Sequence, residues 1–312
     1  MGGFQNNVVP LQLIIRNHSL FAIMKKCLML LVAAFVCCHT YGAAIADAGD
    51  GKYTITNGSL TMTVSKEGGK ILSFKYNDAE VISQTKFPNS FGSTFWTSPQ
   101  KEWNWPPVPE LDRMPYEVKT EGGLTMTSSV SARLKYQVKK EFAVDEKDGA
   151  IVVTYSIVNC SDEVRQVAPW EITRVPNDGV IFFDAAADQI TPAGLLDFKQ
   201  EQGLSWYLAD EANENRKINV DGKGWLAYSA NGLLLLKKFQ DIDPTQPAPG
   251  EAEIQVYVNA RKTFIEIESQ GAYTTLQPGA SFSWTVRWYL QPYEGAAQPS
   301  KKLKQMVEKL CK

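Results

Sequence analysis

The chain has 312 residues and a formal net charge of −2 at pH 7, and its 44% hydrophobic and 21% charged residues are typical of a globular protein. Because no basic excess is available to neutralise phosphates, nucleic acid is not an expected partner. The composition therefore favours a folded domain that acts on something other than a polyanion.

Residues 24–46 have the anatomy of a secretory signal peptide. Two lysines precede an apolar run from Cys27 to Cys38, and Ala44-Ile45-Ala46 forms an A-x-A cleavage motif. The apolar run is too short to cross a bilayer, so no stable membrane span is expected. We predict a secreted or periplasmic protein, with lipoprotein anchoring at Cys37 or Cys38 as the less favoured alternative. Residues 1–23 then represent an upstream extension from a wrongly chosen start.

Removal of residues 1–46 limits the available chemistry. Both histidines, His18 and His39, fall in that segment, so residues 47–312 contain none. Ser-His-Asp and Cys-His catalysis and histidine-ligated metal sites are thereby excluded from the mature chain. The fragment Asp241-Ile242-Asp243 lacks the glycine and glutamate that complete a calcium loop. We expect neither a metal nor a cofactor.

Alternation of apolar and polar residues predicts β-strands almost throughout 47–312. Residues 151–158 and 282–290 alternate with a period of two, and each run lies beside turn-forming residues. Similar runs occupy 59–66, 69–76, 123–130, 134–144, 225–238 and 252–270. An apolar stripe predicts one helix, over 300–310. The pattern therefore indicates an all-β fold of about 18 strands in one antiparallel sandwich domain. We expect Lys139 and Lys140 to lie on a solvated face of it.

The stretch FGSTFWTSPQKEWNWPP, residues 91–107, concentrates three tryptophans and three prolines. In an extended segment, Trp103 and Trp105 project the same way and form a platform for a pyranose ring, with Gln100 among the polar neighbours. The alternative is that the indoles plug the end of the core. We expect the platform at Trp103 or Trp105 and the plug at Trp96.

FGSTFWTSPQKEWNWPPVPELDRMPY (91–116), with Asn57-Gly58 and EGGKI (67–71), resembles a family of secreted bacterial proteins of unassigned function. That family is similar in fold to galactose mutarotase, the aldose 1-epimerase β-supersandwich. VTYSIVNCSDEVRQVAPWEITRV (153–175) looks like the mutarotase strands that lead to the catalytic histidine. FIEIESQGAYTTLQPGASF (264–282) resembles the segment with the catalytic glutamate, which falls on Glu268. The resemblance implies a galactose mutarotase-like supersandwich with a short C-terminal helix.

The histidine of that family has no counterpart here, because residues 168–174 read APWEITR. Glu171 is a candidate acid if burial raises its pKa, whereas Arg174 can only stabilise charge. In a regular strand Trp170 and Arg174 share one face and Glu171 the other. Likewise, one face of strand 263–270 carries Phe264, Glu266, Glu268 and Gln270, and we expect it to border either a cleft or bulk solvent.

These observations favour a carbohydrate-binding protein with a mutarotase-like cleft. The predicted binding residues are Trp96, Gln100, Trp103, Trp105, Trp170, Glu266 and Gln270. The alternative is a carbohydrate-active enzyme of the epimerase type, with Glu268 as base, Glu171 as acid and Arg174 as charge stabiliser. A hydrolase that uses carboxylates, or a lyase with Tyr273 or Tyr116 as base, is a further reading.

Overall fold

The computed structural model describes Gly2, residues 44–87 and residues 90–312. The predictions for residues 1–23 and 24–43 therefore lie outside the described residues, apart from Gly2. Residues 44–312 fall within one compact unit. Its first strand begins at Ala44, so the predicted cleavage motif lies within that strand.

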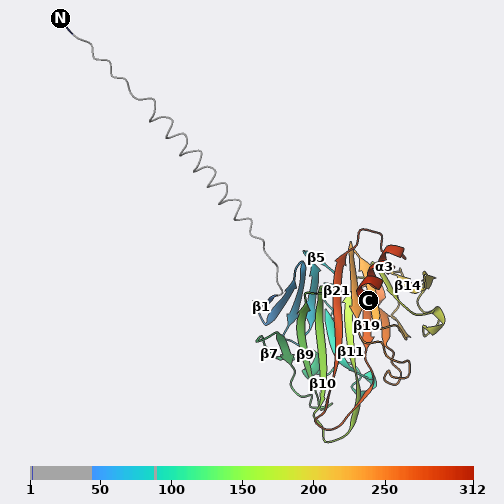
Figure 1. Ribbon diagram of the computed structural model, residues 1–312. Helices are drawn as coiled ribbons and strands as arrows, with labels where there is room; N and C mark the ends of the chain where they lie inside the picture. The colour runs from blue at the N-terminus through green and yellow to red at the C-terminus, as the bar shows by residue number, and fades with distance from the viewer. Residues whose placement is uncertain (1, 3–43, 88–89) are drawn as a thin grey trace. The chain divides into compact units, whose positions relative to one another are not determined.

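The unit consists mainly of two antiparallel sheets (Figure 1). The 11-stranded sheet has the order β1-β2-β3-β4-β6-β11-β19-β18-β15, with β5 paired to β4 and β20 paired to β11. Its strands are β1 Ala44–Gly49, β2 Lys52–Asn57, β3 Leu60–Ser65, β4 Ile71–Tyr76, β5 Ala79–Glu80, β6 Ser93–Ser98, β11 Arg165–Val175, β15 Arg216–Val220, β18 Ile254–Val258, β19 Ile265–Gln270 and β20 Thr274–Leu276.

The 10-stranded sheet has the order β13-β14-β12-β16-β17-β21-β10-β9-β8-β7. Its strands are β7 Glu117–Lys119, β8 Leu124–Thr127, β9 Tyr136–Asp145, β10 Ala150–Asn159, β12 Val180–Phe183, β13 Phe198–Glu201, β14 Leu204–Leu208, β16 Trp225–Ala230, β17 Leu233–Lys238 and β21 Ser281–Pro292. Both runs with the clearest alternation are confirmed as strands, β10 and β21. They pair with each other from Ile151↔Trp288 to Val158↔Ser281.

The main core lies between the two sheets and consists of the inward-facing apolar residues of both. A smaller apolar cluster covers the other face of the 10-stranded sheet. The predicted C-terminal helix is confirmed as α3 Lys301–Cys311, which begins at the N-cap Ser300 and buries Leu303 and Val307 in that cluster (Figure 1). Within the described part of the chain, no helix is long and apolar enough to cross a membrane.

The helical elements before α3 are short and were not predicted. They are η1 Gln100–Glu102, α2 Pro109–Asp112, η2 Ala187–Gln189 and η3 Ala260–Lys262. η1 belongs to the tryptophan-rich stretch, residues 91–107, and α2 follows it directly. After β6 the stretch leaves the sheet, and its Trp103 and Trp105 pack against Trp96 of that strand. Gln100 and Trp105 of this stretch line a cleft on the outer face of the sheet.

The expectation that Lys140 lies on a solvated face is wrong. Lys140 points from β9 into the core, where its ammonium donates to the carbonyl oxygens of Gly68 and Gly69 at 2.7 and 3.0 Å. Its neighbour Lys139 is partly exposed and pairs with Glu141 at 2.8 Å. Burial lowers the pKa of Lys140 to about 7, because the charged form loses its hydration.

Candidate functional site

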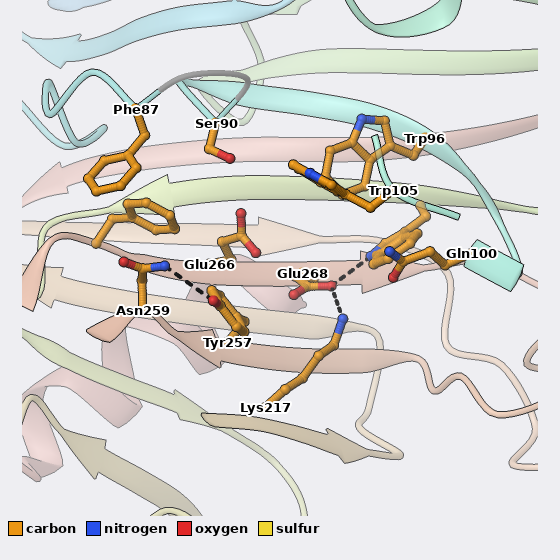
Figure 2. Close-up of a pocket in the computed structure, with 12 residues that line it drawn as sticks. Phe87, Ser90, Trp96, Gln100, Trp105, Lys217, Tyr257, Asn259, Glu266 and Glu268 are labelled. Atoms are coloured by element: carbon orange, nitrogen blue, oxygen red, sulfur yellow. Dashed lines mark hydrogen bonds and ion pairs between the residues drawn. The ribbon is translucent and has the colours of Figure 1, made fainter. Parts of the chain in front are cut away.

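A cleft of about 410 Å³ opens on the outer face of the 11-stranded sheet (Figure 2). Its floor comes from the adjacent strands β6, β11, β19, β18 and β15. Gln100 and Trp105 of the tryptophan-rich stretch form one wall, and Phe87 and Ser90 form the other. The volume is in the range of small-molecule sites, and the lining combines aromatic rings with a few charged and amide groups, as such sites usually do.

Strand register explains why the floor residues meet. One row crosses four strands, from Arg174 on β11 through Glu266 on β19 and Tyr257 on β18 to Lys217 on β15. Residues in register on adjacent strands point to the same face and lie within contact distance. Four polar side chains from distant parts of the sequence are therefore brought onto one surface.

Glu268 lies at the centre of the floor and is almost fully buried, although it borders the cleft. Its Oε2 accepts hydrogen bonds from Trp170 Nε1 at 2.8 Å and from Lys217 Nζ at 3.0 Å (Figure 2). Its Oε1 has no hydrogen-bond partner within the described residues. Burial raises the pKa of Glu268, while the Lys217 ammonium and the indole N–H oppose that rise.

Glu266 forms an ion pair with Arg174 at 2.8 Å. The guanidinium is buried below the cleft surface, with its Cζ 5.8 Å from the centroid of the Trp96 ring and 5.9 Å from that of Phe264. Arg174 does not line the cleft itself. It acts on the site through Glu266 and by supporting these two rings.

The tryptophans form a connected cluster, in which Trp96 contacts Trp103, Trp105 and Trp170 with edge-to-face geometry. Trp105 is 54% exposed and borders the cleft. Trp103 is only 2% exposed and donates from Nε1 to the carbonyl oxygen of Thr97 at 2.8 Å.

The expectation that Trp103 and Trp105 project the same way is therefore wrong. Trp103 ends η1, and Asn104 adopts a left-handed backbone with φ 55°, so the segment is not extended. Trp103 plugs the core, whereas Trp105 has the exposure expected of a platform. Trp96 is buried as expected, yet it also borders the cleft.

A buried carboxylate from α2 fixes the orientation of Trp96. Asp112 accepts from Trp96 Nε1 at 2.8 Å and from Lys70 Nζ at 3.1 Å. The turn before Lys70 approaches α2 closely at Gly68, where a Cβ would lie 1.9 Å from the carbonyl oxygen of Asp112. Only glycine fits there, so this contact holds α2 against the sheet.

Gln100 borders the cleft at the Trp105 end (Figure 2). Its backbone N–H donates to Glu251 at 3.2 Å. Gln270, which was predicted to contact sugar, is fully buried and does not line the cleft. It donates instead to Glu251 and Gln255, both at 3.3 Å, and so belongs to the support behind the site.

Glu171 does not lie in the cleft. As expected, Glu171 lies on the face of its strand opposite to Trp170 and Arg174, and it points between the two sheets. There Lys237 forms an ion pair with it at 2.6 Å, and Tyr155 and Trp288 donate hydrogen bonds to it. It is fully buried, and the sheet separates it from Glu268. The proposed pairing of Glu171 as acid with Glu268 as base is therefore wrong, because the two carboxylates serve opposite faces.

The tyrosines suggested as lyase bases do not line the cleft either. Tyr116 is buried and donates to the carbonyl oxygen of Leu111 at 2.8 Å, and Tyr273 lies elsewhere in the fold. The cleft tyrosine is Tyr257, which accepts from Asn259 Nδ2 at 3.1 Å. Burial raises the pKa of Tyr257, which disfavours its use as a base near neutral pH.

Sequence reasoning missed Lys217, Tyr257, Asn259 and Phe87. Lys217 and Tyr257 occupy outward positions of short alternating strands, a signal that is present in the sequence but is shared by many surface residues. Lys217 and Tyr257 belong to the site because their strands lie next to β19 or one strand away from it. This follows from the order of strands in the sheet, which the local sequence does not reveal. In the part of the chain that the structure describes, no group of three or more acidic, histidine or cysteine side chains is arranged to hold a metal ion.

No family model matches the chain, and no curated protein sequence matches it significantly. Solved structures do match. A galactose mutarotase-like protein from Lactobacillus casei is 14% identical, with a TM-score of 0.54 over 77% of this chain and 100% of its own. A galactose mutarotase-like protein from Clostridium acetobutylicum is 11% identical, with a TM-score of 0.53 over 80% and 99%. Galactose 1-epimerase from Lactobacillus acidophilus is 13% identical, with a TM-score of 0.50 over 81% and 99%. The chain thus has the galactose mutarotase-like fold.

Proposed function

We propose that this protein binds carbohydrate in the cleft on the outer face of the 11-stranded sheet, with Trp105 as an aromatic platform. The observation that carries the proposal is the exposure of Trp105 at the cleft wall, where Trp96 supports it edge-on. An exposed indole beside a polar floor suits a pyranose, whose C–H face stacks on the ring while its hydroxyls meet polar groups.

The floor supplies those polar groups. Glu266 and Glu268 offer carboxylate oxygens, and Lys217 offers an ammonium (Figure 2). Lys217 is also held 4.7 Å above the Trp170 ring, and Arg174 lies over Trp96. Because the protein's own cations already occupy these ring faces, the site is better suited to a hydroxyl-rich ligand than to a cationic one.

A glycan array probed with the purified protein, followed by calorimetric titration of each hit, tests the proposal. We expect saturable binding to at least one glycan class and its loss in Trp105→Ala. Val164→Ala is the matched control, because Val164 is equally exposed and does not border the cleft. Absence of binding across the array, or equal binding by both variants, would contradict the proposal.

An epimerase-like activity is the second candidate, and one observation favours it. Glu268 is a buried carboxylate with a raised pKa and an unpartnered Oε1 beside the cleft. Such a group can accept a proton from a sugar hydroxyl. Lys217, which contacts Glu268, is the nearest cleft group able to supply a proton in place of the missing histidine.

Proton NMR of each sugar hit separates the two candidates. A binding protein leaves the rate of anomeric exchange unchanged, whereas an epimerase-like enzyme accelerates it at catalytic concentration. Release of an unsaturated or a hydrolysed product would instead indicate a lyase or a hydrolase.

We also propose that the protein works after secretion, where extracellular or periplasmic glycans are available. The support is the signal-peptide pattern of residues 24–46. Cleavage after Ala46 would shorten the edge strand β1 by three residues and leave the remaining strands intact. N-terminal sequencing of the exported protein tests the proposal, and a mature chain that begins at Met1 or Met24 would contradict it.

A further inference from the structure

The cleft has an exposed aromatic ring at each end. In the described part of the chain, the exposed aromatic side chains are Trp105 and Phe87, at 54% and 40%, and both border this cleft. Figure 2 shows them at opposite ends, with Glu266 and Glu268 on the floor between them. Exposed aromatic rings that gather in one concave site usually have a ligand to cover them.

The two ends are built alike. Trp105 rests edge-on against the buried Trp96 at a centroid distance of 5.9 Å. Phe87 rests edge-on against the buried Phe264 at 5.6 Å. The Arg174 guanidinium lies within 6 Å of both supporting rings, so one buried side chain contacts the supports of both ends.

Each end also has an amide side chain for hydroxyl groups. Gln100 lies beside Trp105, and Asn259 lies at the Phe87 end, where its backbone N–H donates to the carbonyl oxygen of Phe264 at 3.1 Å (Figure 2). An aromatic face combined with an amide is a complete recognition unit for one sugar ring. The cleft contains two such units.

The residues that support the two ends are well separated along the floor. Trp170, at the Trp105 end, is hydrogen-bonded to Glu268, and Phe264, which immediately precedes β19, lies four residues before Glu268. Four residues of extended chain span about 13 Å. A floor of that length is longer than a single pyranose ring and accommodates two glycosidically linked rings.

We propose that the cleft binds an oligosaccharide, with one sugar ring on Trp105 and the next on Phe87, and the linkage between them above Glu266 and Glu268. The inference rests on the proposed carbohydrate-binding function and specifies its ligand class as a linked glycan rather than a free monosaccharide.

Calorimetric titration with four matched series of probes, one for each sugar, tests the inference. The probes are glucose, galactose, mannose and xylose, each compared with di- and tetrasaccharides of the same sugar in α and β linkage. For at least one sugar we expect the disaccharide to bind about three- to tenfold more tightly than the monosaccharide, as one added aromatic contact would give. The tetrasaccharide should add little more, because the cleft has two aromatic units.

Phe87→Ala should abolish the tighter binding of the disaccharide and leave the affinity for the monosaccharide unchanged. Trp105→Ala should weaken the binding of both. Leu195→Ala is the control, since Leu195 is similarly exposed and lies outside the cleft. Two results would overturn the inference and leave the proposed function intact. One is equal affinity for the mono- and disaccharide of every sugar that binds. The other is an equal loss of affinity for the monosaccharide and the disaccharide in Phe87→Ala. Failure of every probe to bind, together with a glycan array without hits, would overturn both.

Discussion

Glu171 and Glu268 lie on adjacent strands, yet the sheet gives them opposite tasks. Glu171 points between the sheets, where Lys237 neutralises it and two further donors satisfy it. Glu268 points outward, where one oxygen is satisfied and the other has no hydrogen-bond partner among the described residues. The first is a structural ion pair that joins the two sheets, and the second retains a free acceptor beside the cleft.

If the cleft catalyses anomeric exchange, Glu268→Gln should lower its rate by about 10²–10⁴-fold, the usual cost of removing a general base. Affinity should remain within about tenfold, because glutamine keeps the shape and an acceptor for Trp170. Exchange rates from NMR and affinities from calorimetry measure both effects, with the exposed Glu163→Gln as control. Full activity in Glu268→Gln would exclude Glu268 as the base.

Two tryptophans only two residues apart should respond in opposite ways to truncation. Trp103→Ala should cost about 3–5 kcal/mol of unfolding free energy, because it empties a buried indole site and removes a hydrogen bond to Thr97. Trp105→Ala should change stability little and weaken glycan binding by roughly 1–3 kcal/mol. Thermal melting together with titration separates them. A large loss of stability for Trp105→Ala would end its interpretation as a platform.

At the scale of elements, prediction from sequence succeeded where the apolar residues recur with a single period. The alternation of 151–158 and 282–290 and the apolar stripe of 300–310 each indicated the element that the structure contains. The stretch 91–107 has no single period, because it passes from β6 through η1 into an irregular segment before α2. The reversal at Asn104 depends on a left-handed backbone, which asparagine tolerates but does not require.

α2 is only four residues long and relies on tertiary contacts, with Asp112 as its anchor. Asp112→Ala should cost about 3–5 kcal/mol of unfolding free energy, because it leaves the Lys70 ammonium without its carboxylate and Trp96 Nε1 without an acceptor. Denaturant unfolding measures the loss, and glycan titration should show weaker binding because Trp96 supports Trp105.

Glu110→Ala is the control within the same helix. Glu110 accepts a backbone hydrogen bond from Ala132 near the surface, at 2.9 Å, so its loss should cost about 1 kcal/mol or less. Equal losses in the two variants would show that the buried pair with Lys70 is not what holds α2 in place.

At the scale of the whole molecule, the fold class followed from the alternation and the resemblance, but the site did not. Lys217 reaches Glu268, and Tyr257 lies beside Glu266, only because β15, β18 and β19 are neighbours in that order. Local pattern cannot specify such an order. Glu171, Lys237 and Lys140 are charged residues at inward positions, which the alternation of polar and apolar residues does not predict. Their partners come from distant parts of the sequence: Glu171 and Lys237 pair across the two sheets, and Lys140 donates to the turn at Gly68.

Lys140 should make the stability of the whole domain depend on pH. In the unfolded chain its ammonium loses a proton near the ordinary pKa of 10.5, whereas in the folded protein the pKa is lowered to about 7. Between these values the unfolded chain holds more protons, so the contribution of Lys140 to the free energy of unfolding rises with pH from about 7 toward 10. Below about pH 7 both states are protonated, and the full cost of burying the charge is present. Denaturant unfolding of Lys140→Met across this range should show a flatter dependence than the unmodified protein. Lys139→Met, which changes the exposed neighbour on the same strand, should retain the original slope, and identical slopes for all three proteins would show that Lys140 does not titrate in this window.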